Sequence, residues 1–245
     1  MRPVSTSSPV TRWLGILTLI GAGALVLFGL VLSPADEVQQ DSVRLMYVHV
    51  PSAVTAYLAF GVTALGSALW LWRRTRSPFW DRLAGASAEI GVLFTGLCLL
   101  TGMLWGRPTW GVYWTWDARL TSTALLFVLF LGYLALRRVQ ADPDVRARRS
   151  SIAALIAFVD VPVVHYAVDW WRTLHQGSTV STLDPKIDDL MLFSLMLGMV
   201  VFVAAYGWLV THRYRVAQLE EMVDDRRLDL AIEERRAEAE LVVGT

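Results

Sequence analysis

Six long apolar stretches, separated by short polar segments, constrain this chain of 245 residues more than any other feature of its sequence. A helix needs about 20 apolar residues to cross the hydrocarbon core of a bilayer, and each stretch reaches or approaches that length. We therefore predict an all-α integral membrane protein with six transmembrane helices, and with short interfacial helices in its outer loops. The predicted spans are Trp13–Ser33, Ala53–Trp72, Leu83–Leu104, Leu120–Leu136, Ile152–Val168 and Leu190–Val210.

The composition supports this fold class. Hydrophobic residues make up 55% of the chain and charged residues only 18%, whereas about 25% of the residues of a soluble domain are charged. The charges gather between the apolar stretches and after the last one. We therefore predict a membrane domain, residues 1–211, and a charged cytoplasmic tail, residues 212–245, whose alternating acidic and basic residues indicate a solvated helix. Nothing in the composition indicates a nucleic acid partner.

The Arg and Lys residues of the polar segments predict which side of the membrane each segment faces. With the N terminus inside, the inner segments before the tail hold eleven of them: Arg2, Arg12, Arg73, Arg74, Arg76, Arg82, Arg137, Arg138, Arg146, Arg148 and Arg149. The three outer loops hold five: Arg44, Arg107, Arg119, Arg172 and Lys186. Cytoplasmic loops are enriched in Lys and Arg, so we predict that both termini are cytoplasmic. The first stretch is long and lacks a small-residue cleavage signature after Ser33, so it is predicted to be an anchor and not a signal peptide.

The second outer loop, which we call the Trp-rich loop (residues 105–121), carries an unusual density of aromatic side chains. These are Trp105, Trp110, Tyr113, Trp114 and Trp116, followed by Asp117 and Arg119. Indole rings offer large, rigid surfaces on which a broad planar ligand can stack. An aromatic belt at the membrane boundary is the alternative interpretation, but a belt requires neither this density nor the two charges that close the loop.

The other two outer loops each contribute a histidine to the same predicted face. His49 lies just before Pro51, in a position that suits the first turn of a helix, and its ring is expected at the membrane interface. His175 follows Trp170 and Trp171 in a segment, residues 169–176, that resembles the start of a short interfacial helix ended by Gly177. Two neutral imidazoles can bind one iron axially. A planar metal macrocycle is therefore the ligand that this combination of side chains favours.

Other polar residues allow competing interpretations. His165, at the outer end of the fifth span, is a rival ligand that could reach the same cavity. Glu89 and Asp160 lie inside or near apolar stretches, where an ionised carboxylate is costly, and we expect each of them to be paired. Cys98 is the single cysteine, which excludes an intramolecular disulfide and the CxxC and CxxCH motifs. Thiol oxidoreductases and c-type haem proteins are excluded with them.

Three motifs, YVHVPSA, WGVYWTWDARLTS and VDWWRTLHQ, together resemble the C-protein family (CcmC, haem exporter protein C) of the cytochrome c maturation system, within the group that has a tryptophan-rich WWD domain. The resemblance runs from the first span to the sixth. Related haem lyases typically have Pro after the Asp of this loop, whereas here Asp117 is followed by Ala118 and Arg119, which together with six spans favours the C protein. Val54 and Tyr113 stand where many relatives have Trp, which reduces the aromatic surface without removing it.

The resemblance implies haem handling and not enzymatic catalysis. Such proteins hold b-type haem, non-covalently and transiently, at the periplasmic face of the bacterial inner membrane. They pass it to a periplasmic haem chaperone (CcmE-like), with ABC transporter subunits (CcmA/CcmB-like) and a small single-span CcmD-like protein assisting. In this chain the resemblance implies His49 and His175 as axial ligands, and Arg119, with Arg107 or Arg172 as further candidates, as partners of the propionates. The remaining expected cofactor-binding residues are Trp110, Tyr113, Trp114, Trp116, Asp117, Trp170 and Trp171.

The sequence also allows two functions of other classes. A b-type haem electron carrier or quinol oxidoreductase usually has paired histidines within its spanning helices, whereas the candidates here lie at span boundaries on one side. A scaffold for assembly partners, without cofactor, would use the Trp-rich loop as a docking surface, because interface hot spots are rich in such residues. Turnover with quinol would identify the first function, and protein that carries no haem would identify the second.

Overall fold

The computed structural model describes residues 6–139, 141–175 and 187–243, with side chains of the last helix described up to Arg236. Apart from one isolated bridge between Asp36 and Gln40, the regular structure of these residues is helical. The α-helices are α1 (Pro9–Leu25), α2 (Met46–Leu71), α3 (Pro78–Trp110), α4 (Ala118–Arg138), α5 (Pro143–Phe158), α6 (Asp160–Trp170) and α7 (Asp189–Val243). A π-helical segment, Val26–Leu32, continues α1, and a 3₁₀ helix, Asp41–Leu45, leads into α2.

The six predicted spans are confirmed. Six helical segments are long and apolar enough to cross a membrane: Pro9–Leu32, Asp41–Leu71, Pro78–Trp110, Ala118–Arg138, Pro143–Trp170 and Asp189–Arg236. The fifth span is two helices, α5 and α6, that meet at Val159. Pro162 explains this break, because proline has no N–H to donate to the carbonyl four residues earlier. The tail predicted to be helical is the direct continuation of α7.

Several helices begin earlier than hydropathy predicts because their capping residues lie outside the apolar stretches. At the start of α1, the Ser8 side chain accepts a hydrogen bond from the Thr11 N–H. Ser77 accepts from the Phe79 N–H at the start of α3, and Asp142 accepts from the Asp144 N–H at the start of α5. Asp117 caps α4 by accepting from the Leu120 N–H at 2.8 Å. These side chains satisfy N–H groups that have no partner inside a helix.

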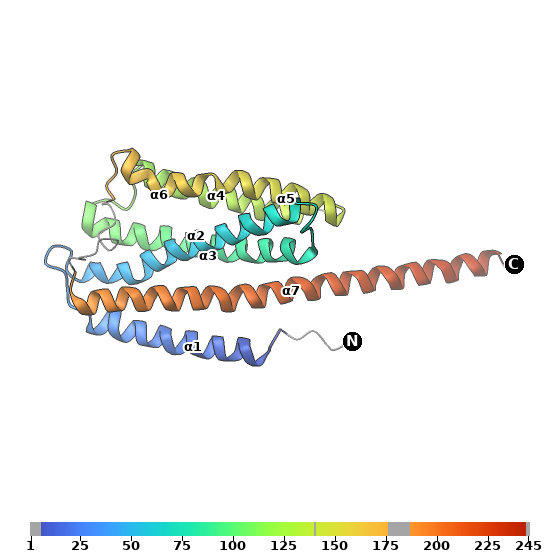
Figure 1. The fold of residues 1–245 in the computed structure, drawn as a ribbon, viewed down its shortest axis with the longest axis horizontal. Coiled ribbons are helices and arrows are strands. Elements are labelled where there is room, and N and C mark those ends of the chain that lie inside the picture. Colours follow the sequence, from blue (N-terminus) through green and yellow to red (C-terminus); the bar gives the residue numbers. More distant parts are fainter. Residues whose placement is uncertain (1–5, 140, 176–186, 244–245) are drawn as a thin grey trace.

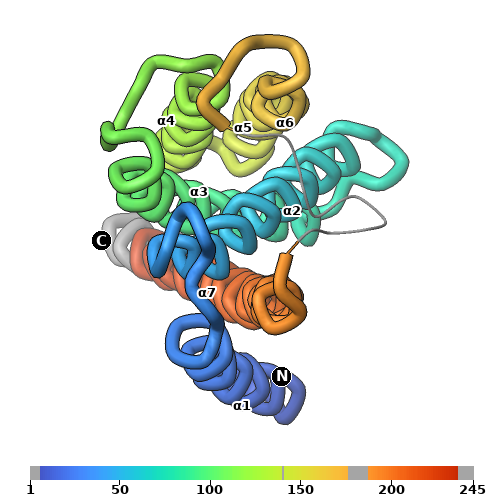
Figure 2. Tube along the Cα trace, turned by 90° about the vertical axis from the view of Figure 1, so that its left-hand side faces the viewer, coloured from blue at the N-terminus to red at the C-terminus, as the bar shows by residue number. Residues whose placement is uncertain are grey.

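Helices α2 and α3 lie side by side at the centre of the bundle (Figures 1 and 2). The α1–α7 pair lies on one flank and α4, α5 and α6 lie on the other. The core between α2 and α4 is closed by the stacked rings of Phe60 and Phe130, whose centroids are 3.7 Å apart. Gly91 of α3 allows this packing, since a Cβ there would lie 2.6 Å from the Phe60 ring.

Ion pairs join the helices at the end where α7 leaves the bundle. Arg137 of α4 binds the Asp81 carboxylate of α3 through two hydrogen bonds, of 2.6 and 2.9 Å. Arg213 of α7 pairs with Glu89, so the pairing predicted for Glu89 is confirmed. Asp160 differs, because its Oδ2 atom is buried without a hydrogen-bond partner in the described part of the chain.

The three predicted outer loops meet at the opposite end of the bundle, on the left of Figure 1. Two local predictions about this end are wrong. Helix α2 begins at Met46, so Pro51 lies inside the helix and not in its first turn; the preceding 3₁₀ turn supplies the start instead. The predicted interfacial helix at residues 169–176 is also absent from the residues described there, since α6 ends at Trp170 and Trp171 is extended.

The physical reason for the second difference is a competing hydrogen bond. The Leu174 N–H donates to Asp117 of the Trp-rich loop at 3.0 Å, which draws this segment across to the loop and away from helical geometry. Three residues named in the predictions above, Arg2, Gly177 and Lys186, and the last position of the predicted interfacial helix, residue 176, lie outside the described residues.

Candidate functional site

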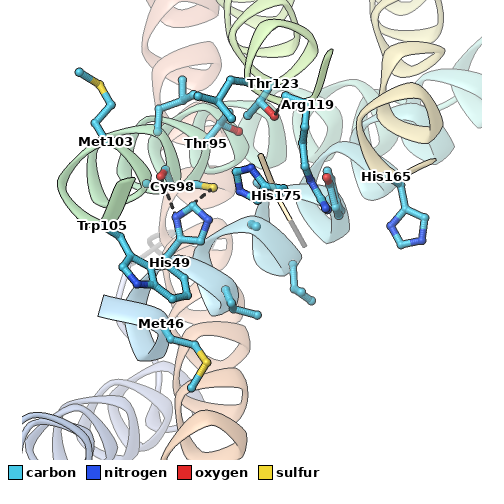
Figure 3. Close-up of a pocket in the computed structure, with 18 of the residues that line it drawn as sticks. Met46, His49, Thr95, Cys98, Met103, Trp105, Arg119, Thr123, His165 and His175 are labelled. Atoms are coloured by element: carbon cyan, nitrogen blue, oxygen red, sulfur yellow. Dashed lines mark hydrogen bonds between the residues drawn. The ribbon is translucent and has the colours of Figure 1, made fainter. Parts of the chain in front are cut away.

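A cavity of about 640 Å³ opens at the end of the bundle where the three loops meet. Its walls come from α2, α3, α4, α6 and α7 and from the segment that carries His175 (Figure 3). Ligand pockets commonly measure about 300–1,000 Å³. The lining is mainly apolar and includes four methionines, Met46, Met103, Met196 and Met199. Met side chains adapt to the shape of large apolar ligands.

His49 is held firmly in this wall by its own helix and by α3. Its Nδ1–H donates to the Cys98 carbonyl at 3.0 Å, and the Thr101 hydroxyl lies 3.3 Å from the same nitrogen. Because a carbonyl only accepts, this contact places the ring proton on Nδ1 and leaves the Nε2 lone pair free to bind a metal. Gly102 makes room for the ring, since a Cβ there would lie 2.9 Å from its Cε1 atom.

His175 approaches the same space from the third loop. Its ring lies edge-on to the indole of Trp110, with centroids 4.9 Å apart. Its Nδ1 atom is buried and has no hydrogen-bond partner among the described residues. Burial, with smaller contributions from Arg119 and His49, lowers the pKa of His175 to about 4. The imidazole is therefore neutral at physiological pH, which is the form that binds metals.

The two imidazoles are at the separation that one shared metal requires. Their ring centroids lie 6.3 Å apart and their planes are inclined by 30°. Metal–imidazole bonds of about 2 Å, plus about 1 Å from each ring centre to its nitrogen, put two axial rings about 6 Å apart. The predicted meeting of His49 and His175 is therefore found in the structure, although they come from sequence positions more than a hundred residues apart.

Arg119, in the first turn of α4, supplies positive charge to the cavity wall. None of the ion pairs found among the described residues involves it. It interacts instead with the phenol of Tyr57 on α2. A partly buried guanidinium without a carboxylate partner offers a two-pronged site for an anionic ligand.

The aromatic residues of the predicted site divide into two groups. Trp110 and Trp114 line the cavity, and the Nε1–H of Trp114 is buried without a partner in the part of the chain that the structure describes. The other four do not line the cavity and are exposed: Tyr113, Trp116, Trp170 and Trp171. Trp116, which is 79% exposed, packs edge-on against Trp114 with ring centroids 5.5 Å apart.

Trp105 lines the cavity although we did not predict it as a binding residue. Its indole lies edge-on to His49, with centroids 5.7 Å apart, and its Nε1–H donates to Gln39 of the first loop at 2.8 Å. Arg107 lies outside the lining; it caps the end of α3 at Gly111 and stacks over the Tyr113 ring. Sequence spacing placed Trp105 in the aromatic cluster, but it could not show which ring would meet His49.

Asp117 connects two of the loops. One carboxylate oxygen caps α4 through the Leu120 N–H, and the other accepts from the Leu174 N–H at 3.0 Å. The residue lies outside the cavity lining. It therefore contacts the backbone beside His175 and not the cavity, although it was predicted among the cofactor-binding residues.

His165, the rival ligand, lines the cavity at a distance from the other two histidines (Figure 3). Its ring packs against Tyr57 and Tyr166, with centroid distances of 6.2 and 4.8 Å. No ring contact joins it to His49 or His175 within the described residues. These neighbours favour His49 and His175 as the pair.

The sequence is similar to proteins of one family over most of its length. A family model described as "Heme exporter protein C" matches residues 2–229. A protein of that name from Haemophilus influenzae is 40% identical over 206 residues, which cover 84% of this chain and 83% of the relative. One from Bradyrhizobium diazoefficiens is 39% identical over 205 residues, covering 82% and 76%. The family match includes the first five spans in full and ends within α7, at residue 229.

A more distant relative is described in a plant. An Arabidopsis thaliana protein named "Putative cytochrome c biosynthesis ccmC-like mitochondrial protein" is 35% identical over 171 residues. That alignment covers 70% of this chain and 64% of the relative. The similarity therefore extends beyond bacterial proteins.

Proposed function

Because this chain belongs to the haem exporter protein C family, we propose that it binds haem and hands it on during the maturation of c-type cytochromes. Membership implies a role in haem handling for cytochrome c maturation. In our proposal the protein binds and delivers its cargo and is not a classical enzyme. The membrane is the bacterial inner membrane, and the end of the bundle that holds the cavity faces the periplasm.

The observation that carries this proposal is the pair of imidazoles in one apolar cavity beside an arginine without a carboxylate partner. His49 and His175 are the axial ligands of the haem iron. An electron carrier would instead hold haem between histidines within its spanning helices, whereas His175 lies beyond the end of α6. The haem is b-type and held non-covalently and transiently, since the chain has one cysteine and covalent c-type attachment uses the CxxCH motif.

The remaining site residues bind the macrocycle and its acidic side chains. Trp110 and Trp114 contact the ring system, because both line the cavity. Arg119 pairs with a propionate through its bidentate fork. The exposed Tyr113, Trp116, Trp170 and Trp171 surround the edge at which haem is received and released.

The partners in this proposal follow from the family and not from a contact in the structure. Haem passes to a CcmE-like periplasmic haem chaperone. CcmA/CcmB-like ABC transporter subunits and a CcmD-like single-span protein form the complex in which this transfer takes place. Membrane lipid surrounds the bundle in this proposal, because six helices are long and apolar enough to cross a bilayer.

Absorption spectroscopy of the purified full chain tests the site. Protein made in haem-replete cells should show a low-spin haem spectrum that is lost in a variant with both His49→Ala and His175→Ala. His165→Ala is the matched control, because its ring also lines the cavity, and it should keep the spectrum. A wild-type low-spin spectrum in the double variant would refute the axial assignment. Covalent haem on a co-purified chaperone would test delivery.

A further inference from the structure

The protein holds the two proposed iron ligands in different ways. His49 sits in a continuous helix, donates from Nδ1 to a carbonyl of the neighbouring helix at 3.0 Å, and packs against Gly102 and Trp105. A hydrogen bond from the ring nitrogen that does not bind the metal orients a ligating imidazole and raises its basicity. His49 is therefore built as a fixed ligand.

His175 lacks this support. It lies beyond the end of α6, where the backbone is no longer helical, and its buried Nδ1 has no partner among the described residues. The Thr173 hydroxyl donates to the carbonyl of His175 itself at 3.1 Å, which is a contact within the same segment. Nothing in the described part of the chain fixes the tautomer or the orientation of this ring by hydrogen bonding.

One hydrogen bond connects residues 172–175 to another element in the part of the chain that the structure describes. It is the bond from the Leu174 N–H to the second carboxylate oxygen of Asp117, at 3.0 Å. The first oxygen of Asp117 caps α4, so the carboxylate is itself held rigidly. The position of His175 thus depends on a side chain of the Trp-rich loop.

We propose, on the basis of the function proposed above, that His175 is the displaceable iron ligand and that Asp117 is the positioning residue that controls its release. When another donor takes its place, the bond from iron to the His175 nitrogen breaks and the nitrogen keeps its electron pair. The incoming donor supplies the electron pair of the new bond, and the bond to His49 remains. The exchange requires no oxidant or reductant. Any movement of Asp117 that lengthens its contact with the Leu174 N–H would therefore loosen His175 and leave the hydrogen bond of His49 to the Cys98 carbonyl in place.

Carbon monoxide binding to the reduced, haem-loaded full chain in detergent measures this release. At saturating gas, the rate of binding equals the rate at which the weaker histidine leaves. Asp117→Asn and Asp117→Ser both keep a preferred capping residue for α4 but remove the second acceptor for Leu174. We expect each to raise the limiting rate about tenfold, the lower end of the effect of outer partners on metal ligation. Gly96→Ala, whose added Cβ would meet the Phe127 ring at an ordinary 3.4 Å and neither histidine, should leave the rate unchanged.

Chemical modification identifies which ring has left. Diethyl pyrocarbonate reacts with free imidazole nitrogens, and mass spectrometry locates the product. Wild-type protein under carbon monoxide should be modified at His175 and protected at His49. Modification of His49 with protection of His175, or wild-type rates in both folded Asp117 variants, would overturn the proposal.

The spectrum and the modification pattern of the wild-type protein also distinguish a failure of this proposal from a failure of the function on which it rests. If the wild type shows no low-spin haem spectrum, the proposed function fails. If the spectrum is present but His49 is the ring that leaves, only the present inference fails. Should an Asp117 variant not fold, the modification pattern of the wild type decides the question by itself.

Discussion

Replacing Gly102 by alanine should weaken haem binding through His49 alone. The added Cβ would lie 2.9 Å from Cε1 and 3.3 Å from Nδ1 of His49. Ordinary carbon–carbon contacts begin at about 3.5 Å, so the ring must retreat by roughly 0.6 Å. A retreat of that size lengthens the 3.0 Å hydrogen bond from Nδ1 to the Cys98 carbonyl to about 3.6 Å, beyond hydrogen-bonding distance.

The expected cost follows from that lost contact. Removing an outer partner of a metal-binding histidine lowers metal affinity by about 10- to 100-fold, which corresponds to about 1.4–2.7 kcal/mol. Alanine is a better helix former than glycine by about 0.8–1.0 kcal/mol. The loss of haem affinity should therefore occur without a lower helix content in the haem-free protein.

Haem titration of the haem-free protein, followed by absorption, measures the affinity, and circular dichroism measures helix content. Gly96→Ala is the matched control on the same helix, since a Cβ there would lie 3.4 Å from the Phe127 ring, an ordinary contact. It should bind haem like the wild type. If Gly102→Ala bound haem with wild-type affinity and spectrum, the ring would not depend on this space and the reasoning would be refuted.

Three further predictions concern charge. Arg119→Gln should lower haem affinity and lessen its dependence on salt, as measured by titration at two ionic strengths; equal salt dependence in both proteins would exclude propionate pairing. Asp81→Asn should destabilise the fold by about 3 kcal/mol, because it leaves Arg137 buried without its carboxylate partner. Thermal unfolding in detergent should show this loss, and a variant that also carries Arg137→Met should recover stability. Burial lowers the pKa of His175 to about 4, so the neutral ring favours the folded, haem-competent state fully above pH 6.5, and this contribution is lost as pH falls toward 4. Haem binding should persist from pH 7.5 to 5.5, and a loss by pH 6 would contradict the assigned cause.

The sequence contained most of the information about the architecture. Hydropathy located all six spans, and because alternate loops of a six-helix bundle share a face, it also predicted that His49, the Trp-rich loop and His175 would meet. The first residues of the helices were harder to predict, since capping residues such as Ser8 and Ser77 lie outside the apolar stretches. The segment after Trp170 was predicted as a helix, and only the tertiary contact with Asp117 explains its extended form.

The candidate site was predictable in its two axial imidazoles and in Arg119, but only partly in its other residues. His49, His175 and Arg119 line one cavity as expected. Trp116 and Trp171 resemble Trp110 in sequence, but they are exposed, because loop geometry and not residue type decides which indole turns inward. Nothing in the sequence indicated that Tyr57 and the four methionines line the cavity, since an apolar residue inside a span has the same pattern whether it faces lipid or a cavity.

The unbroken course of α7 has a mechanical consequence. Leu195, Met196 and Met199 form part of the cavity wall, and the same helix continues to Val243 over 55 residues, a length of about 80 Å. A continuous helix of this length moves as one rigid body, because no break lies between its two ends. A load applied to its distal end would turn or tilt the three side chains that face the cavity, and distances from a spin label near that end to a second label on α4 would reveal that motion.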